Sequence, residues 1–255
     1  MPNEMFDLSG KVAIVTGGNG GIGLGIARGL AMAGANIVVA ARNQQKTNDA
    51  VDHLTGLGVN ALGISTDVSD EASVAAMVEA TIGEFGGVDI LVNNAGIGIR
   101  KAPQDYTLEE WNQVTDINLT GVFLCCRDVY PHMASAGGGK IINIGSMTSI
   151  FGSDWVASYS ASKGGVVQLT KSLAVAWAKD NIQVNALLPG WIHTDLTAAI
   201  KQNNTERYDF IESRIPHGRW GEPDEMAGTA VFLSGHASDY VTGVSIPVDG
   251  GYSVF

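Results

Sequence analysis

The sequence has little cysteine, little positive charge and no long hydrophobic run. Its 255 residues include two cysteines, Cys125 and Cys126, and neighbours in sequence rarely form a structural disulfide. We therefore expect no disulfide framework and a reducing, cytoplasmic setting. No apolar stretch is long enough to span a membrane, and the first residues lack the basic and apolar regions of a secretory signal.

The shortage of positive charge argues against a second class of partner. Lysine and arginine together number 15 against 26 aspartate and glutamate residues, which gives a formal net charge of −11. Non-specific binding of nucleic acid needs a basic footprint, so neither a nucleic acid nor a membrane is expected as a partner. No cluster of cysteine and histidine has the spacing of metal ligands, so no metal site is predicted.

What the chain does contain is an alternation of short apolar runs and amphipathic stretches. Seven runs predict strands, and most are apolar throughout, as in parallel strands buried on both faces. They are Lys11–Thr16, Asn36–Ala41, Asn60–Thr66, Ile90–Asn93, Lys140–Gly145, Gln183–Leu188 and Val244–Val248. The predicted helices between them include Gly21–Ala33, Glu71–Phe85, Leu108–Met133, Ser158–Lys179 and Pro223–Leu233.

Repeated βα units predict an α/β fold, a Rossmann-type doubly wound parallel sheet of about seven strands with helices on both faces. No linker, repeat or low-complexity tract divides the chain, so residues 1–255 are expected to form a single domain. The polar, weakly periodic segment 192–216 follows a strand end, where such folds bind ligands. It is predicted to be a helical flap that covers the substrate.

A glycine-rich turn lies between the first predicted strand and the first predicted helix. It runs from Gly17 to Gly23, where small residues let the backbone turn tightly and approach a pyrophosphate. The N-terminus of the following helix offers free N–H groups to that anion. Glycine also serves plain turns, but this placement favours dinucleotide binding.

The end of the second predicted strand indicates which dinucleotide is bound. NAD sites usually place a carboxylate there for the ribose 2′-hydroxyl, whereas here Ala41 is followed at once by Arg42. An arginine can bind the 2′-phosphate that a carboxylate would repel. We therefore predict NADP(H), with a plain surface arginine as the alternative interpretation.

Tyr159 and Lys163 are four residues apart on a predicted helix and therefore share a face. A nearby ammonium favours the phenolate and lowers the pKa of a tyrosine from about 10, so that Tyr159 can act as a general acid or base. Ser146 follows the fifth predicted strand, where a hydroxyl can point into a cleft. An exposed helical pair and a turn-forming serine are the alternative interpretation, which the other motifs of the chain disfavour.

With these motifs in hand, the chain resembles the short-chain dehydrogenase/reductase family over essentially its whole length. The matching segments are the glycine loop, Asp67-Val68, Asn93 to Gly96, Asn118 with its neighbours, the set Ser146, Tyr159 and Lys163, and Pro189-Gly190 with Thr194. The resemblance implies that Tyr159 exchanges a proton with the substrate oxygen, which Ser146 orients. It also implies that Lys163 binds the nicotinamide ribose and that Asn118 holds a water linking Lys163 to solvent.

The resemblance further implies which residues contact the cofactor. They are Gly17, Asn19, Gly20, Gly21, Ile22, Gly23, Arg42, Asn43, Asp67, Val68, Asn94, Ala95, Gly96, Tyr159, Lys163, Pro189, Gly190, Ile192 and Thr194. One departure concerns the nucleotide, because members that prefer NADP often carry a basic residue where this chain has Gly20. Use of NAD beside NADP therefore stays open.

The substrate expected from the resemblance is a small secondary alcohol or its ketone. The stretch from Asn93 to Lys101 is similar to that of gluconate 5-dehydrogenases and keto-deoxygluconate dehydrogenases. Arg100 in this stretch can pair with a substrate carboxylate, with a solvated loop charge as the alternative. Trp155, Trp191 and His193 are expected to line the pocket. A sugar, sugar acid or small polar ketone is therefore predicted.

Two other functions stay open. The same reaction can act on a 3-oxoacyl thioester or on an alicyclic, steroid-like ketone, although an acyl carrier would favour a basic docking patch. More remotely, the chain can be a non-catalytic nucleotide-sensing protein, but such proteins typically lose the tyrosine or the lysine. Because members of the family are usually homotetramers, we expect assembly through the helices over 108–133 and 158–179 and the C-terminal strand region.

Overall fold

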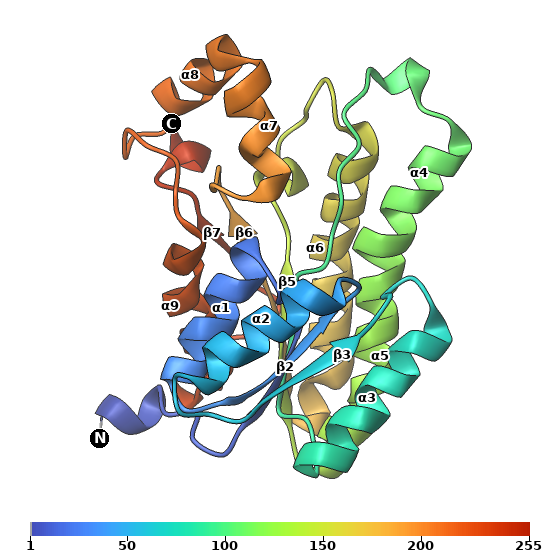
Figure 1. Cartoon of the computed structure of the whole chain (residues 1–255), viewed down its shortest axis with the longest axis vertical. Helices are drawn as coiled ribbons and strands as arrows, with labels where there is room; N and C mark the ends of the chain where they lie inside the picture. Colours follow the sequence, from blue (N-terminus) through green and yellow to red (C-terminus); the bar gives the residue numbers. More distant parts are fainter. Residues whose placement is uncertain (1) are drawn as a thin grey trace.

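Seven parallel strands form a sheet in the order β3-β2-β1-β4-β5-β6-β7 in the computed structural model, which describes residues 2–255 (Figure 1). The strands are β1 (Val12–Thr16), β2 (Asn36–Ala41), β3 (Ala61–Ser65), β4 (Ile90–Asn93), β5 (Gly139–Ile144), β6 (Ile182–Pro189) and β7 (Ser245–Val248). The predicted α/β architecture is confirmed, and each strand ends within one residue of its predicted bounds.

Helices cover both faces of the sheet, and the strand side chains alternate between the two layers. The first layer holds α1 (Gly21–Met32), α2 (Gln44–Thr55) and α9 (Ala227–Ser234), and the second holds α3 (Glu71–Phe85), α5 (Gly121–Ser135) and α6 (Ala157–Trp177). In β1, Ala13 and Val15 pack in the first layer, whereas Val12 and Ile14 pack in the second. Burial on both sides explains why the strands are apolar throughout.

Two parts of the helical layers differ most from the sequence prediction. The polar helix α2 was not predicted, because only Thr47, Ala50 and Leu54 along it are buried. The helix predicted over 108–133 is present but not uniform, because α4 (Leu108–Thr115) passes into α5 through a turn of π-helix, η3 (Asp116–Thr120). Gly121 directly follows this turn, but a single glycine within a helical pattern does not by itself indicate a π-helical turn.

Two short helices, α7 (Asp195–Asn203) and α8 (Thr205–Ser213), stand above the carboxyl ends of β6 and β7 (Figure 1). Their buried side chains form a small hydrophobic cluster with Trp220, apart from the two main cores. The other members of this α7–α8 cluster are Ile200, Tyr208, Ile211 and Ile215. Within residues 2–255, no helix combines the length and hydrophobicity that a membrane crossing requires.

Candidate active site

The site residues predicted from sequence meet at the carboxyl edge of the sheet. Gly17 follows β1, Asn94 follows β4, Ser146 follows β5, and Gly190 follows β6. These four strands are adjacent in the sheet. Connections leave β1 and β4 in opposite directions along the sheet, and doubly wound folds open a ligand crevice at such a point.

Ser146, Tyr159 and Lys163 lie close together below this edge. Lys163 is 3% exposed, and its Nζ donates a 2.6 Å hydrogen bond to the carbonyl of Ile144 at the end of β5. The same Nζ lies 5.7 Å from the centroid of the Tyr159 ring, as expected for neighbours one helical turn apart. Ser146 begins a short 3-10 turn and hydrogen-bonds Tyr159.

The electrostatics of Tyr159 differ from the sequence expectation. Burial raises the pKa of Tyr159, while a hydrogen bond with Ser146 and the charge of Arg100 lower it. Burial also lowers the pKa of Lys163, to about 8. Lys163 is not among the groups that lower the pKa of Tyr159 here, because its ammonium donates to Ile144 and is itself desolvated, so its tuning of the tyrosine stays a prediction.

Asn118 joins three segments of the site from within the π-helical turn η3. Its Oδ1 accepts from the backbone N–H of Ile97 at 2.8 Å, and its Nδ2 donates to the Ile97 carbonyl at 2.9 Å. The same Nδ2 donates to Ser162 Oγ on α6 at 3.2 Å. With no exposed surface, Asn118 ties the segment after β4 to the helix that carries Tyr159 and Lys163. Its role in holding a water stays a prediction.

A cavity of about 320 Å³ lies beside the glycine loop, at the ends of β2 and β3. It brings together the predicted cofactor residues Gly17, Asn19, Arg42, Asn43, Asp67, Val68, Ala95 and Gly96. Lys46 also lines this cavity, although sequence reasoning missed it. Asn43 caps α2 by accepting from the Lys46 N–H, which places the third residue of the helix next to the strand end. The sequence signal for Lys46 was a lysine three residues after a helix-capping asparagine at a strand end.

The glycine loop has the shape that a dinucleotide needs. Gly17 has a φ of +63°, and a Cβ on Gly23 would lie 2.3 Å from the Gly17 carbonyl oxygen, so the loop and α1 pack backbone against backbone. The N-cap residue of α1 is Gly20, which has no side chain to cap the helix, so the first N–H groups are available to a phosphate. The residues present therefore fit a dinucleotide.

The remaining predicted cofactor residues surround the loop without lining that cavity. Asn94 Nδ2 donates to the carbonyls of Thr16 and Gly17 at 3.0 and 3.1 Å, so it supports the loop from below. Thr194 lies across from the loop, since a Cβ on Gly21 would lie 3.2 Å from its methyl group. The other residues outside the lining are Gly20, Ile22, Gly23, Tyr159, Lys163, Pro189, Gly190 and Ile192.

Gly96 lies between the cavity beside the glycine loop and the side chains of Asn118 and Lys163. A Cβ at this position would lie 3.2 Å from Asn118 Oδ1 and 3.6 Å from Lys163 Nζ. Because Gly96 also lines the cavity, a nucleotide there approaches Lys163 across a backbone that carries no side chain. This arrangement agrees with the expected role of Lys163 at the nicotinamide ribose.

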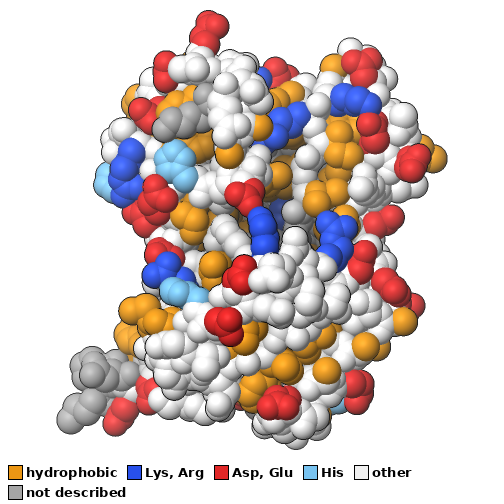
Figure 2. All heavy atoms as spheres, in the orientation of Figure 1, with side chains coloured by type: hydrophobic (Ala, Val, Ile, Leu, Met, Phe, Trp, Pro, Cys, Tyr) orange, Lys and Arg blue, Asp and Glu red, His pale blue; other side chains and the backbone are white. Residues whose placement is uncertain are grey.

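A larger cavity of about 700 Å³ adjoins this region and contains Ser146, Tyr159 and Gly190. Side chains of α7 and α8, among them Leu196 and Arg207, form its opposite wall. Figure 2 shows basic side chains along the hollow between the α7–α8 part and the α4 part of the molecule. The volume and the mixture of apolar and polar walls are those of a small-molecule site.

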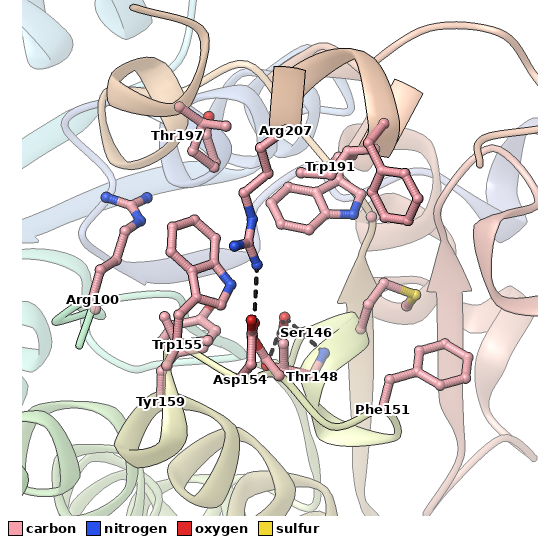
Figure 3. Close-up of a pocket in the computed structure, with 18 of the residues that line it drawn as sticks. Arg100, Ser146, Thr148, Phe151, Asp154, Trp155, Tyr159, Trp191, Thr197 and Arg207 are labelled. Atoms are coloured by element: carbon pink, nitrogen blue, oxygen red, sulfur yellow. Dashed lines mark hydrogen bonds and ion pairs between the residues drawn. The ribbon is translucent and has the colours of Figure 1, made fainter. Parts of the chain in front are cut away.

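Two arginines enclose Trp155 on one side of this cavity (Figure 3). The guanidinium carbon of Arg207 lies 3.7 Å from the ring centroid of Trp155, and that of Arg100 lies 5.3 Å away. Arg207 donates to Asp154 at 3.1 Å, whereas Arg100 donates to the backbone carbonyl of Leu196. Burial and the charge of Arg207 both lower the pKa of Arg100.

The structure places the four predicted substrate residues unequally. Arg100, Trp155 and Trp191 line the large cavity. His193 does not, and that prediction is wrong: its ring stacks on Trp220 and Tyr208, at centroid distances of 5.6 and 6.3 Å.

Most of the other cavity residues were not identified from the sequence. Among them are Arg207, Arg214 and Tyr252. Arg207 and Ile211 lie on α8 and Arg214 caps its C-terminus, at the i, i+4 and i+7 spacing that the sequence already contained.

Comparisons with known proteins agree with this geometry. Residues 17–253 match a family model described as enoyl-(acyl carrier protein) reductase. The chain is 44% identical to a 2-dehydro-3-deoxy-D-gluconate 5-dehydrogenase of Dickeya dadantii, over 97% of both chains, and 39% identical to a gluconate 5-dehydrogenase of Gluconobacter oxydans, over 98% of both. A solved gluconate 5-dehydrogenase from Burkholderia cenocepacia, in complex with NADP and tartrate, superposes with a TM-score of 0.95, 40% identity and full coverage of both chains.

Proposed function

The chain belongs to the short-chain dehydrogenase/reductase family, and we propose that this NAD(P)-dependent oxidoreductase interconverts a secondary alcohol and a ketone on a sugar acid. The observation that carries the proposal is the position of Arg100, which lines the same cavity as Ser146 and Tyr159. An anion bound to Arg100 brings a neighbouring hydroxyl or carbonyl to the two catalytic hydroxyls. The relatives named for gluconate and keto-deoxygluconate support this substrate class.

The catalytic residues divide the proton chemistry between them. A bound nicotinamide supplies or accepts the hydride. Tyr159 donates a proton to the substrate oxygen during reduction and removes it during oxidation, while Ser146 hydrogen-bonds and orients that oxygen. Lys163 provides a buried positive charge one helical turn from Tyr159. Asn118 ties the helix that carries Tyr159 and Lys163 to the segment after β4.

We propose NADP(H) as the preferred cofactor. Arg42 and Lys46 both line the cavity at the end of β2, and no described carboxylate forms an ion pair with Arg42. Two cations at this position suit the 2′-phosphate of NADP, whereas NAD has no anionic group there for them to bind. Lys46 thus supplies the second basic contact that the sequence lacks at Gly20.

A sugar acid suits the large cavity better than an acyl thioester does, although the matching family model carries an acyl carrier protein reductase description. Arg100, Arg207 and Arg214 all contribute to its walls. A long acyl chain would desolvate these guanidinium groups without offering them partners, which is unfavourable. A small anionic polyol satisfies them.

The test is a substrate panel with the purified enzyme, followed by NADPH oxidation. We expect turnover of 5-keto sugar acids, with little or none of 3-oxoacyl thioesters and cyclic ketones. An Arg100→Gln variant should raise KM for the keto acid about tenfold or more, since a charge-assisted contact contributes 1.5–3 kcal/mol. The matched control is a neutral keto sugar of equal length, whose KM should not change. Preference for the thioester, or equal effects on acid and neutral sugar, would contradict the proposal.

A homotetramer in the cytoplasm remains our expectation for the assembled enzyme. Several apolar side chains on the helices over 108–133 and 158–179 are exposed in the single chain, which supports an interface there. They are Leu108, Trp111, Phe123 and Val175, and the C-terminal Val254 and Phe255 are exposed as well.

A further inference from the structure

The ion pairs of the seven arginines single out three positions. Four arginines pair with carboxylates, namely Arg28, Arg127, Arg207 and Arg219. Among the described residues, no carboxylate forms an ion pair with Arg42, Arg100 or Arg214, in a chain with 26 acidic residues. All three line one of the two larger cavities. Arg42 serves the nucleotide and Arg100 the substrate anion proposed above, which leaves Arg214 without an assigned partner.

Arg214 is held in place by Tyr252. Its guanidinium carbon lies 4.7 Å from the ring centroid of Tyr252, and its Nη1 donates to the Tyr252 hydroxyl at 3.2 Å. The remaining N–H groups of this guanidinium have no hydrogen-bond partner among the described residues. Stacking therefore orients the cation without neutralising it, which is the arrangement that a ligand anion needs.

Arg214 and Arg100 lie toward opposite ends of the large cavity. In Figure 3, Arg100 and Trp155 lie on one side of Ser146, and Trp191 and Phe151 on the other. The Tyr252 ring under Arg214 contacts this second side, at centroid distances of 6.3 Å from Phe151 and 6.4 Å from Trp191.

The helix itself separates the two ends. Arg207, which stacks on the same indole as Arg100, is seven residues before Arg214, and seven residues advance a helix by about 10 Å. The catalytic hydroxyls of Ser146 and Tyr159 belong to the cavity that connects both ends.

We propose that Arg214 and Tyr252 form a second anion subsite, so that the substrate is a linear polyhydroxy acid with an anionic group at each end. Arg100 binds the carboxylate nearer Tyr159, and Arg214 binds a carboxylate or phosphate at the far end. The reacting carbon lies between them, opposite Ser146 and Tyr159. This inference rests on the proposed function in one respect, the assignment of the first carboxylate to Arg100.

The test measures binding without turnover. Trp155 and Trp191 line the cavity, so quenching of tryptophan fluorescence reports occupancy. Saturated dicarboxylates of three to seven carbons are titrated against monocarboxylates of the same lengths. We expect one dicarboxylate length to bind about tenfold more tightly than its monocarboxylate, equivalent to about 1.4 kcal/mol. Arg214→Gln should remove this difference and leave the Kd of the monocarboxylate unchanged.

Two further variants separate the subsite from a merely structural stacking contact. Tyr252→Phe keeps the ring under Arg214 but removes the hydroxyl, and it should reduce the dicarboxylate advantage in part. Lys179→Gln removes one charge at an exposed position beyond the C-terminal end of α6 and should change nothing. Equal binding of mono- and dicarboxylates at every length would overturn the proposal. So would a dicarboxylate preference that persists in Arg214→Gln.

Sugar acids then identify the second anion. D-Gluconate, D-glucarate and 6-phospho-D-gluconate differ only in their far end. Tighter binding of glucarate identifies a carboxylate, tighter binding of the phosphate ester identifies a phosphate, and no gain over gluconate contradicts the subsite. If the dicarboxylate preference is found but no sugar acid is oxidised, the subsite stands and the proposed reaction fails. If sugar acids turn over but no dicarboxylate preference is found, the proposed reaction stands and the subsite fails.

Discussion

Lys46 and Asp195 form an ion pair that links the two cavities of the molecule. The Nζ of Lys46 on α2 lies 3.0 Å from Oδ2 of Asp195, the first residue of α7. Lys46 lines the nucleotide cavity, and α7 contributes to the wall of the substrate cavity. A phosphate that binds Lys46 competes with Asp195 for the ammonium group. Nucleotide binding therefore affects the contact that holds the start of α7.

The first prediction concerns nucleotide choice. Arg42→Ala and Lys46→Ala should each raise KM for NADPH about tenfold, the loss of one charge-assisted contact, with KM for NADH unchanged. Asp195→Asn should lower KM for NADPH, by at most about fivefold, because the exposed ion pair that it removes contributes no more than about 1 kcal/mol. Steady-state kinetics with both nucleotides checks this. A parallel rise of both KM values in Arg42→Ala would show that the residue does not read the phosphate.

A second prediction concerns proton transfer. Tyr159→Phe should reduce kcat/KM about 10²- to 10⁴-fold, the usual contribution of a general acid, while NADPH still binds. Because the hydrogen bond from Ser146 lowers the pKa of Tyr159, Ser146→Ala should move the apparent pKa of the reaction upward. The pH dependence of kcat/KM in both directions measures this shift. An active Tyr159→Phe enzyme would exclude the mechanism.

The third prediction follows from the buried ammonium of Lys163. Its pKa is about 8 in the folded protein and about 10.4 in an unfolded chain, so the unfolded state binds more protons between these values. The free energy of unfolding should therefore rise with pH across this window, by up to about 3 kcal/mol from this group. Denaturant titrations of the wild type and of Lys163→Met from pH 7.5 to 10.5 isolate the contribution of Lys163 to the free energy of unfolding. The variant should lack this part of the rise, and identical slopes would contradict the assignment.

The fourth prediction concerns assembly. Val175 on α6 is 83% exposed in the single chain, so Val175→Asp should leave the fold intact but weaken an interface through this helix. Light scattering after gel filtration should show a tetramer for the wild type and smaller species for the variant. Met32→Asp, at an exposed position on the opposite layer, serves as the control. A monomeric wild type would refute the expectation.

The elements that sequence predicted well are those whose signals are local. Glu71–Phe85 was predicted with its correct bounds, since Asp70 caps it by accepting from Ala72 and Gly86 ends it with a φ of +81°. Buried strands were equally clear because each face of the sheet is covered by helices. The motifs after β1, β4, β5 and β6 came together because parallel strands end at one edge.

What the sequence could not predict depends on packing in three dimensions. His193 and Trp191 are two residues apart and both rings pack against Trp220, yet Trp191 lines the cavity and His193 does not. The hydrogen-bond partner of Lys163 could not be predicted for a related reason. Spacing brought Lys163 to the right face, but only the structure shows its ammonium bonded to Ile144.

The separate α7–α8 cluster has an evolutionary consequence. The residues that perform the chemistry are anchored in the sheet and its two main cores, whereas Arg207 and Arg214 belong to a segment packed through its own few apolar side chains. Mutations on the cavity face of α8 can therefore change which compound is accepted while the catalytic apparatus and most of the folding energy are retained. A new substrate specificity can therefore arise in this segment through few substitutions, and α8 is the segment to randomise in a selection experiment.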